Sequence, residues 1–186
     1  MKITGIVLWV LFSLYSGIGG LCKINLEAEI DKIEAQKDSL QKIIIDREFF
    51  TRDHLRVTFS NEYQSQRFIK INEYTNVFPW ITFIPSYLGL LLTSLCFGIL
   101  GALGKILLNE ANGASSSTVV CLIVTPLLGM IVGMCTLGMS YILPTILTFN
   151  TDSVRPTTLM FFSLFSGMYS ESFFAKIASA FSKLFK

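Results

Sequence analysis

The stretch TVVCLIVTPLLGMIVGMCTLGMS, residues 118–140, contains no charged residue and decides the fold class. Its small and hydroxyl-bearing residues recur every three or four positions, so in an α-helix they share one face. We call this face the small-residue stripe; its members are Thr118, Cys121, Thr125, Gly129, Gly133, Thr136 and Ser140. Length and lack of charge predict a membrane-spanning helix over 118–149, with Pro126 and Pro144 as the expected sites of bending.

The composition of the whole chain favours the same fold class. Of its 186 residues, 52% are hydrophobic and only 15% are charged, which is far from the average of soluble proteins. The net charge is +2, and the basic residues are scattered among acidic ones, so bulk nucleic acid is not an expected partner. We therefore expect an all-α membrane protein embedded in a lipid bilayer.

Two further uncharged runs predict two more membrane spans. In residues 1–22 an uncharged run follows Lys2 and predicts a membrane span, although a secretory signal peptide has a similar pattern. Residues 78–104 are flanked by interfacial aromatic residues and are followed by a polar loop over 105–117. Within this run Ser94, Gly98 and Ala102 repeat at four-residue spacing, which favours close packing against another helix.

The charged segment 23–53 predicts a coiled-coil helix. Its aliphatic residues recur with heptad spacing, which would bring several copies of the chain together. The expected seam consists of Leu26, Ile30, Ile33, Lys37, Leu40, Ile44 and Arg47. The alternative is an amphipathic helix that packs on its own chain, because isolated helices of this length are marginally stable in water.

Residues 54–77 form the expected small soluble segment. The stretches 54–59 and 67–74 alternate apolar and polar side chains, and turn-forming residues lie between them. The pattern predicts a β-hairpin that needs a neighbour to cover one face.

The tail, residues 150–186, begins with an apolar run over 157–170 that is too short to span a membrane. After Glu171 the spacing of aromatic and basic residues predicts an amphipathic helix on the membrane surface; docking on the soluble part of the chain is the alternative. Most Lys and Arg residues lie in 23–70 and in the tail, so both regions are predicted to be cytoplasmic.

The small-residue stripe has two physical uses. It can let a neighbouring helix approach closely, or several copies can turn it toward a central axis and line a pore. The spans contain neither His nor a carboxylate that could act as a general base, so we expect no enzyme, and no cofactor or metal is expected.

The tail motif SGMYSESFF, residues 166–174, resembles an element near the ends of small bacterial membrane proteins, several of which accompany antiviral defence operons. The plan of spans plus a cytosolic coil also resembles the membrane channel subunit of Hailong-type defence systems. This resemblance implies a homo-oligomeric channel in the bacterial inner membrane that depolarises it in response to a nucleotide-derived ligand or a soluble partner protein.

If that resemblance holds, basic residues near the coil are the candidates for meeting an anionic ligand, although for any single residue we favour a solvated face paired with neighbouring carboxylates. They are Lys37, Lys42, Arg47, Arg52 and Arg56. The alternative functions are a non-conducting membrane anchor or scaffold for a soluble partner, and a holin-like lytic toxin.

Overall fold

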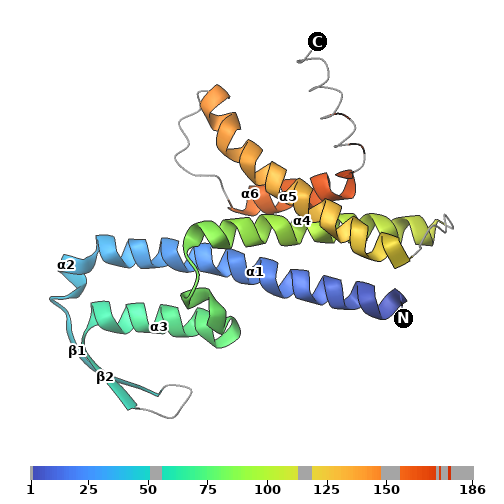
Figure 1. Cartoon of the computed structure of the whole chain (residues 1–186). Coiled ribbons are helices and arrows are strands. Elements are labelled where there is room, and N and C mark those ends of the chain that lie inside the picture. Colours follow the sequence, from blue (N-terminus) through green and yellow to red (C-terminus); the bar gives the residue numbers. More distant parts are fainter. Residues whose placement is uncertain are drawn as a thin grey trace. The chain divides into compact units, whose positions relative to one another are not determined.

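The computed structural model describes residues 2–50, 56–112, 119–147 and 156–170, together with 172 and 176. Within them the chain is mostly helical (Figure 1) and carries one two-stranded sheet. The elements are α1 (Lys2–Ala35), α2 (Lys37–Leu40), β1 (Ile44–Phe50), β2 (Arg56–Asn61), α3 (Glu62–Val77), the 3-10 helix η1 (Pro79–Thr82), α4 (Ser86–Ala111), α5 (Val119–Leu147) and α6 (Pro156–Met168).

The chain divides into two units. The apolar unit comprises Met1–Leu21 and Tyr87–Lys186, and the hairpin unit comprises Cys22–Ser86. Three helical segments within the described residues are long and apolar enough to cross a membrane, namely Thr4–Ala35, Ser86–Ala111 and Ile123–Tyr141. The prediction of three span-length helices therefore agrees with the structure, and the fold is that of a candidate multi-span protein.

The boundaries of these helices differ from the predicted ones. The helix of the second run begins at Ser86 rather than at residue 78, because Pro85 disfavours helical geometry in the residue before it. It then continues through Ala111, so the predicted loop is helical over 105–111. This extension is rich in good helix formers and contains neither Gly nor Pro.

The third run forms one continuous helix, α5, that passes through both Pro126 and Pro144. The uncharged run at the N-terminus likewise continues without interruption into the charged segment, so α1 extends to Ala35. The change from uncharged to charged residues near residue 22 therefore does not end the helix.

The prediction of a coiled-coil helix over 23–53 is wrong beyond Ala35. The chain forms the short helix α2 and then strand β1, which contains the seam positions Ile44 and Arg47. The run of three isoleucines at 43–45 and the aromatic residues at 49–50 favour an extended strand over a helix.

The first part of the predicted seam packs on its own chain. Leu26 is buried with Phe78 and Ile81, and we call these three residues the hairpin core. Ile30 packs against the hairpin core as well. This arrangement matches the alternative prediction for this segment, an amphipathic helix that packs on its own chain.

The predicted β-hairpin exists, but with different strands. β1 pairs antiparallel with β2, with Glu48 opposite Thr58 and Phe49 opposite Val57. The segment 67–74, expected to be the second strand, lies in α3 instead. Asn61 starts this helix, because its side chain accepts a hydrogen bond from the backbone N–H of Gln64 at 2.9 Å.

One face of the sheet is covered by α3 through an aromatic cluster. The ring of Phe68 lies 5.0 Å from that of Phe59 and 6.3 Å from that of Phe49, measured between centroids. This contact supplies the cover that a two-stranded sheet needs for stability.

The apolar run of the tail forms α6, which begins at Pro156, a residue well suited to the first turn of a helix. The amphipathic helix predicted after Glu171 lies outside the described residues apart from Ser172 and Lys176.

Candidate functional site

One buried hydroxyl joins three helices of the apolar unit. Ser94 on α4 is fully buried and donates a hydrogen bond to the carbonyl oxygen of Gly133 on α5 at 2.6 Å. Its oxygen also lies 2.7 Å from the hydroxyl oxygen of Ser163 on α6. Since a serine hydroxyl has one proton to donate, Ser163 is the donor in this second bond. The chain thus satisfies two buried hydroxyls without water.

Close backbone approach surrounds Ser94. A Cβ atom at Gly98 would overlap the carbonyl oxygen of Gly129, and a Cβ atom at Gly133 would overlap that of Ser94. A Cβ atom at Gly129 would lie 2.5 Å from the oxygen of Gly98 and 2.8 Å from the Cβ of Ala102. Only glycine permits helices to come this close. We call this contact of α4 with α5 and α6 the glycine junction.

Helix α6 completes the glycine junction from another side. A Cβ atom at Gly101 would overlap the carbonyl oxygen of Leu164, and one at Gly167 would overlap that of Gly98. Figure 1 shows α5 and α6 both lying against α4. The tail segment that is too short to span is therefore used to close the junction.

A second small-residue contact joins α1 to α4 within the apolar unit. The hydroxyl of Thr93 donates to the carbonyl oxygen of Gly89 at 2.8 Å and lies 3.3 Å from that of Gly17. A Cβ atom at Gly20 would lie 2.5 Å from the Gly89 oxygen. Sequence reasoning missed this site, although Ser13, Ser16, Gly17 and Gly20 repeat at helical spacing.

The small-residue stripe of α5 is divided by the structure. Gly129 and Gly133 lie in the glycine junction, and Thr136 is buried and donates back to the carbonyl oxygen of Val132 at 2.8 Å. Ser140 donates to the carbonyl oxygen of Leu137 at 2.7 Å. Thr125 is half-buried, whereas Thr118 and the side chain of Cys121 lie outside the described residues.

The second candidate site, anion binding near the coil, is not assembled among the described residues. The ammonium of Lys37 lies 3.9 Å from the carboxylate of Glu34 and 5.7 Å from the ring centroid of Tyr63, and Arg56 forms an ion pair with Glu48. Lys42 is exposed. The side chain of Arg47 and all of Arg52 lie outside the described residues.

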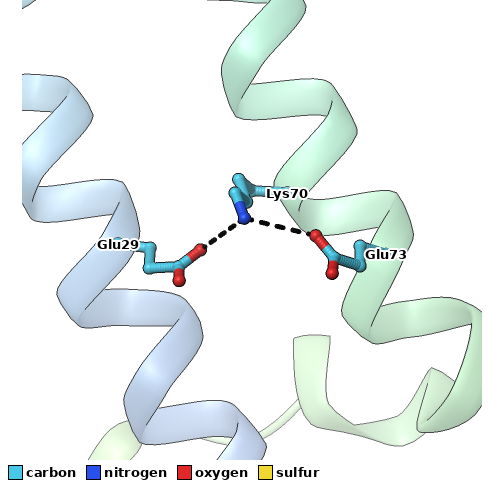
Figure 2. Close-up of polar contacts among 3 residues, drawn as sticks. All are labelled: Glu29, Lys70 and Glu73. Carbon is cyan, nitrogen blue, oxygen red and sulfur yellow. Dashed lines mark hydrogen bonds and ion pairs between the residues drawn. The ribbon is translucent and has the colours of Figure 1, made fainter.

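Another lysine forms the principal charged contact of the hairpin unit (Figure 2). Lys70 on α3 lies between Glu29 of α1, at 3.1 Å, and Glu73 of α3, at 3.3 Å. The hydrogen bond with Glu29 raises the pKa of the Lys70 ammonium, and Glu73 adds to the effect. Desolvation raises the pKa of the neighbouring Tyr74 phenol, and the charge of Glu29 adds to it. This contact fastens α3 to α1.

No metal-binding chemistry is evident in the described part of the chain, where no group of three or more His, Cys, Asp or Glu side chains could hold an ion. Comparisons with protein-family models, with curated proteins and with solved structures give no match. The described part of the chain is thus a helical fold with three segments that are long and apolar enough to cross a membrane.

Proposed function

We propose that this chain is a membrane anchor that presents its hairpin unit at a membrane surface and forms no aqueous path along α5. The observation that carries the proposal is the glycine junction, in which Gly129 and Gly133 contact α4 within a single chain. The part of the small-residue stripe that α4 covers, Gly129 and Gly133, does not face a central axis. In this arrangement its small residues serve packing.

The face of α5 that remains exposed also supports an anchor. The large exposed side chains on it are hydrophobic and, apart from the phenol of Tyr141, carry no oxygen that could act as a ligand to a hydrated ion, which suits contact with lipid acyl chains. They are Ile123, Val124, Leu127, Ile131, Met134, Met139 and Tyr141. The two buried hydroxyls at the centre of the junction bond to each other and to backbone rather than to a channel.

A homo-oligomeric channel lined by Gly129 and Gly133 would require α5 to leave α4 and turn these residues toward other copies of the chain. That movement would break the hydrogen bond between Ser94 and Gly133 and would open the contact between Gly98 and Gly129. Several expectations from the sequence stay predictions. They are the channel, its gating by a nucleotide-derived ligand or soluble partner, its role in antiviral defence, the lytic toxin and the location in a bacterial inner membrane.

Planar-bilayer recording of the purified full-length chain tests the proposal. We expect no conductance from the wild type under applied voltage, and we expect Gly133→Leu to lose stability because its side chain would strike the backbone of Ser94. The proposal is overturned if the wild type gives discrete conductance that Gly133→Leu abolishes while both proteins keep the same mass in detergent. Gly138→Leu serves as the matched control, since open space surrounds Gly138.

A further inference from the structure

The two residues at which the candidate spans join the hairpin unit, Cys22 and Ser86, both contact residues near the start of that unit or its core. Helix α1 enters the unit at Cys22, and α4 begins at Ser86, where the unit ends. Cys22 packs against the hairpin core, and the hydroxyl of Ser86 donates a hydrogen bond to Glu27 on α1. The hairpin core therefore marks the end of the unit from which both spans continue.

A turn at this end holds two large apolar side chains outward. Val77 and Phe83 are 61% and 86% exposed, whereas Phe78 and Ile81 between them are buried in the hairpin core. The backbone N–H of Phe83 donates to the carbonyl oxygen of Trp80 at 3.2 Å, which closes the turn after η1. The buried side chains thus fix the turn while Phe83 points away from the hairpin unit.

The sequence around this turn lacks charge. No Asp, Glu, Lys or Arg occurs between Glu73 and Lys105. Phe83 lies three residues before Ser86, a reach of at most about 10 Å of extended chain. A side chain so close to the start of a membrane span lies at the level of the lipid headgroups, where aromatic residues are enriched.

We propose that Phe83 forms an interfacial foot that inserts into the headgroup layer of the lipid bilayer. The inference rests on the proposed function, since it takes α4 as a membrane span. The occupant is the bilayer because the foot lies three residues before α4, is uncharged and follows a turn whose Phe78 and Ile81 belong to the hairpin core. The foot adds a second attachment beside the spans and thereby limits rotation of the hairpin unit at the membrane surface.

Quenching of tryptophan fluorescence by brominated lipid measures this insertion directly. The full-length chain carrying Trp9→Phe and Trp80→Phe is reconstituted into phosphatidylcholine vesicles whose acyl chains are brominated near the headgroup. A single tryptophan is then introduced by Phe83→Trp. Because Phe83 is exposed, this substitution disturbs no core.

Two matched variants complete the experiment. Gln64→Trp places the indole at an exposed position of α3, about 20 Å along the helix from Val77, and Leu91→Trp places it within α4. We expect the F83W and L91W proteins to lose fluorescence to the brominated lipid, and the Q64W protein to keep it and to be quenched by acrylamide in water.

The possible outcomes distinguish failure of the interfacial foot from failure of α4 as a membrane span. If the F83W protein behaves like the Q64W protein while the L91W protein is quenched, the interfacial foot is wrong and the span stands. If none of the three is quenched by the lipid, α4 is not in the membrane, and the proposed function fails together with the foot.

Discussion

Replacement of Gly129 by Ala places a methyl group inside the glycine junction. The new carbon would lie 2.5 Å from the carbonyl oxygen of Gly98 and 2.8 Å from the Cβ atom of Ala102. These separations are about 1 Å short of ordinary van der Waals contact. Neither neighbour is the end of a flexible side chain, so α4 and α5 must move apart to accommodate the methyl group.

Two effects of opposite sign determine the stability of this variant. Alanine favours the helix over glycine by about 1 kcal/mol, whereas overpacking a close contact costs about 1–3 kcal/mol. Because helix separation also stretches the hydrogen bond between Ser94 and Gly133, we expect Gly129→Ala to lower the free energy of unfolding by about 1–2 kcal/mol. Gly138→Ala on the same helix meets no atom within 4 Å and keeps only the gain in helix propensity.

Unfolding of the purified chain from mild detergent by added dodecyl sulfate, followed by far-ultraviolet circular dichroism, measures this difference. We expect the midpoint of Gly129→Ala to lie below that of the wild type, and the midpoint of Gly138→Ala to lie at or above it. Equal midpoints for the two variants would show that Gly129 does not contact α4.

Three further predictions concern other contacts. Ser94→Ala removes the buried hydroxyl that joins α4, α5 and α6 and should cost about 1 kcal/mol in the same unfolding assay; no loss at all would contradict the hydrogen bonds. Leu26→Ala should destabilise the hairpin unit by about 2–4 kcal/mol, measured as earlier thermal loss of circular dichroism, whereas Ile44→Ala at an 87% exposed position should have no effect. The ion pair of Lys70 with Glu29 raises the lysine pKa above its ordinary 10.5, so its contribution is complete below that pH and is lost as the pH rises through the folded pKa. Between about pH 10 and 12 the free energy of unfolding of the wild type should therefore fall more than that of Lys70→Gln. If the two free energies change with pH in parallel, the ion pair of Lys70 with Glu29 is contradicted.

The three long helices could be predicted because they depend on local composition. An uncharged run of span length predicts a helix, and most of each run is α-helical in the structure: all of 3–22, residues 86–104 of the run 78–104, and residues 119–147 of the run 118–149. The four-residue spacing of Ser94 and Gly98 also defined one helix face in advance, and both residues lie in the glycine junction.

The packing partners of these small-residue faces on α4 and α5 could not be predicted. Spacing shows that Gly129 and Gly133 share a side of a helix, but it does not show whether another helix of the same chain or another copy covers them. The contribution of Ser163 was hidden because α6 is shorter than a span. The seam was mispredicted for a related reason, since heptad spacing continued through Ile44 while the isoleucine run favoured a strand.

A cross-link between positions 94 and 163 tests the central claim, that the small residues of α4, α5 and α6 pack within one chain. The two hydroxyl oxygens lie 2.7 Å apart, so Ser94→Cys with Ser163→Cys, in a chain whose four native cysteines are replaced by alanine, brings two thiols into contact. Mild oxidation followed by mass spectrometry identifies the product. We expect an intramolecular disulfide at the mass of a single chain. A product that forms only between chains, or no disulfide at all, would show that the small residues of α4 and α6 do not pack within one chain.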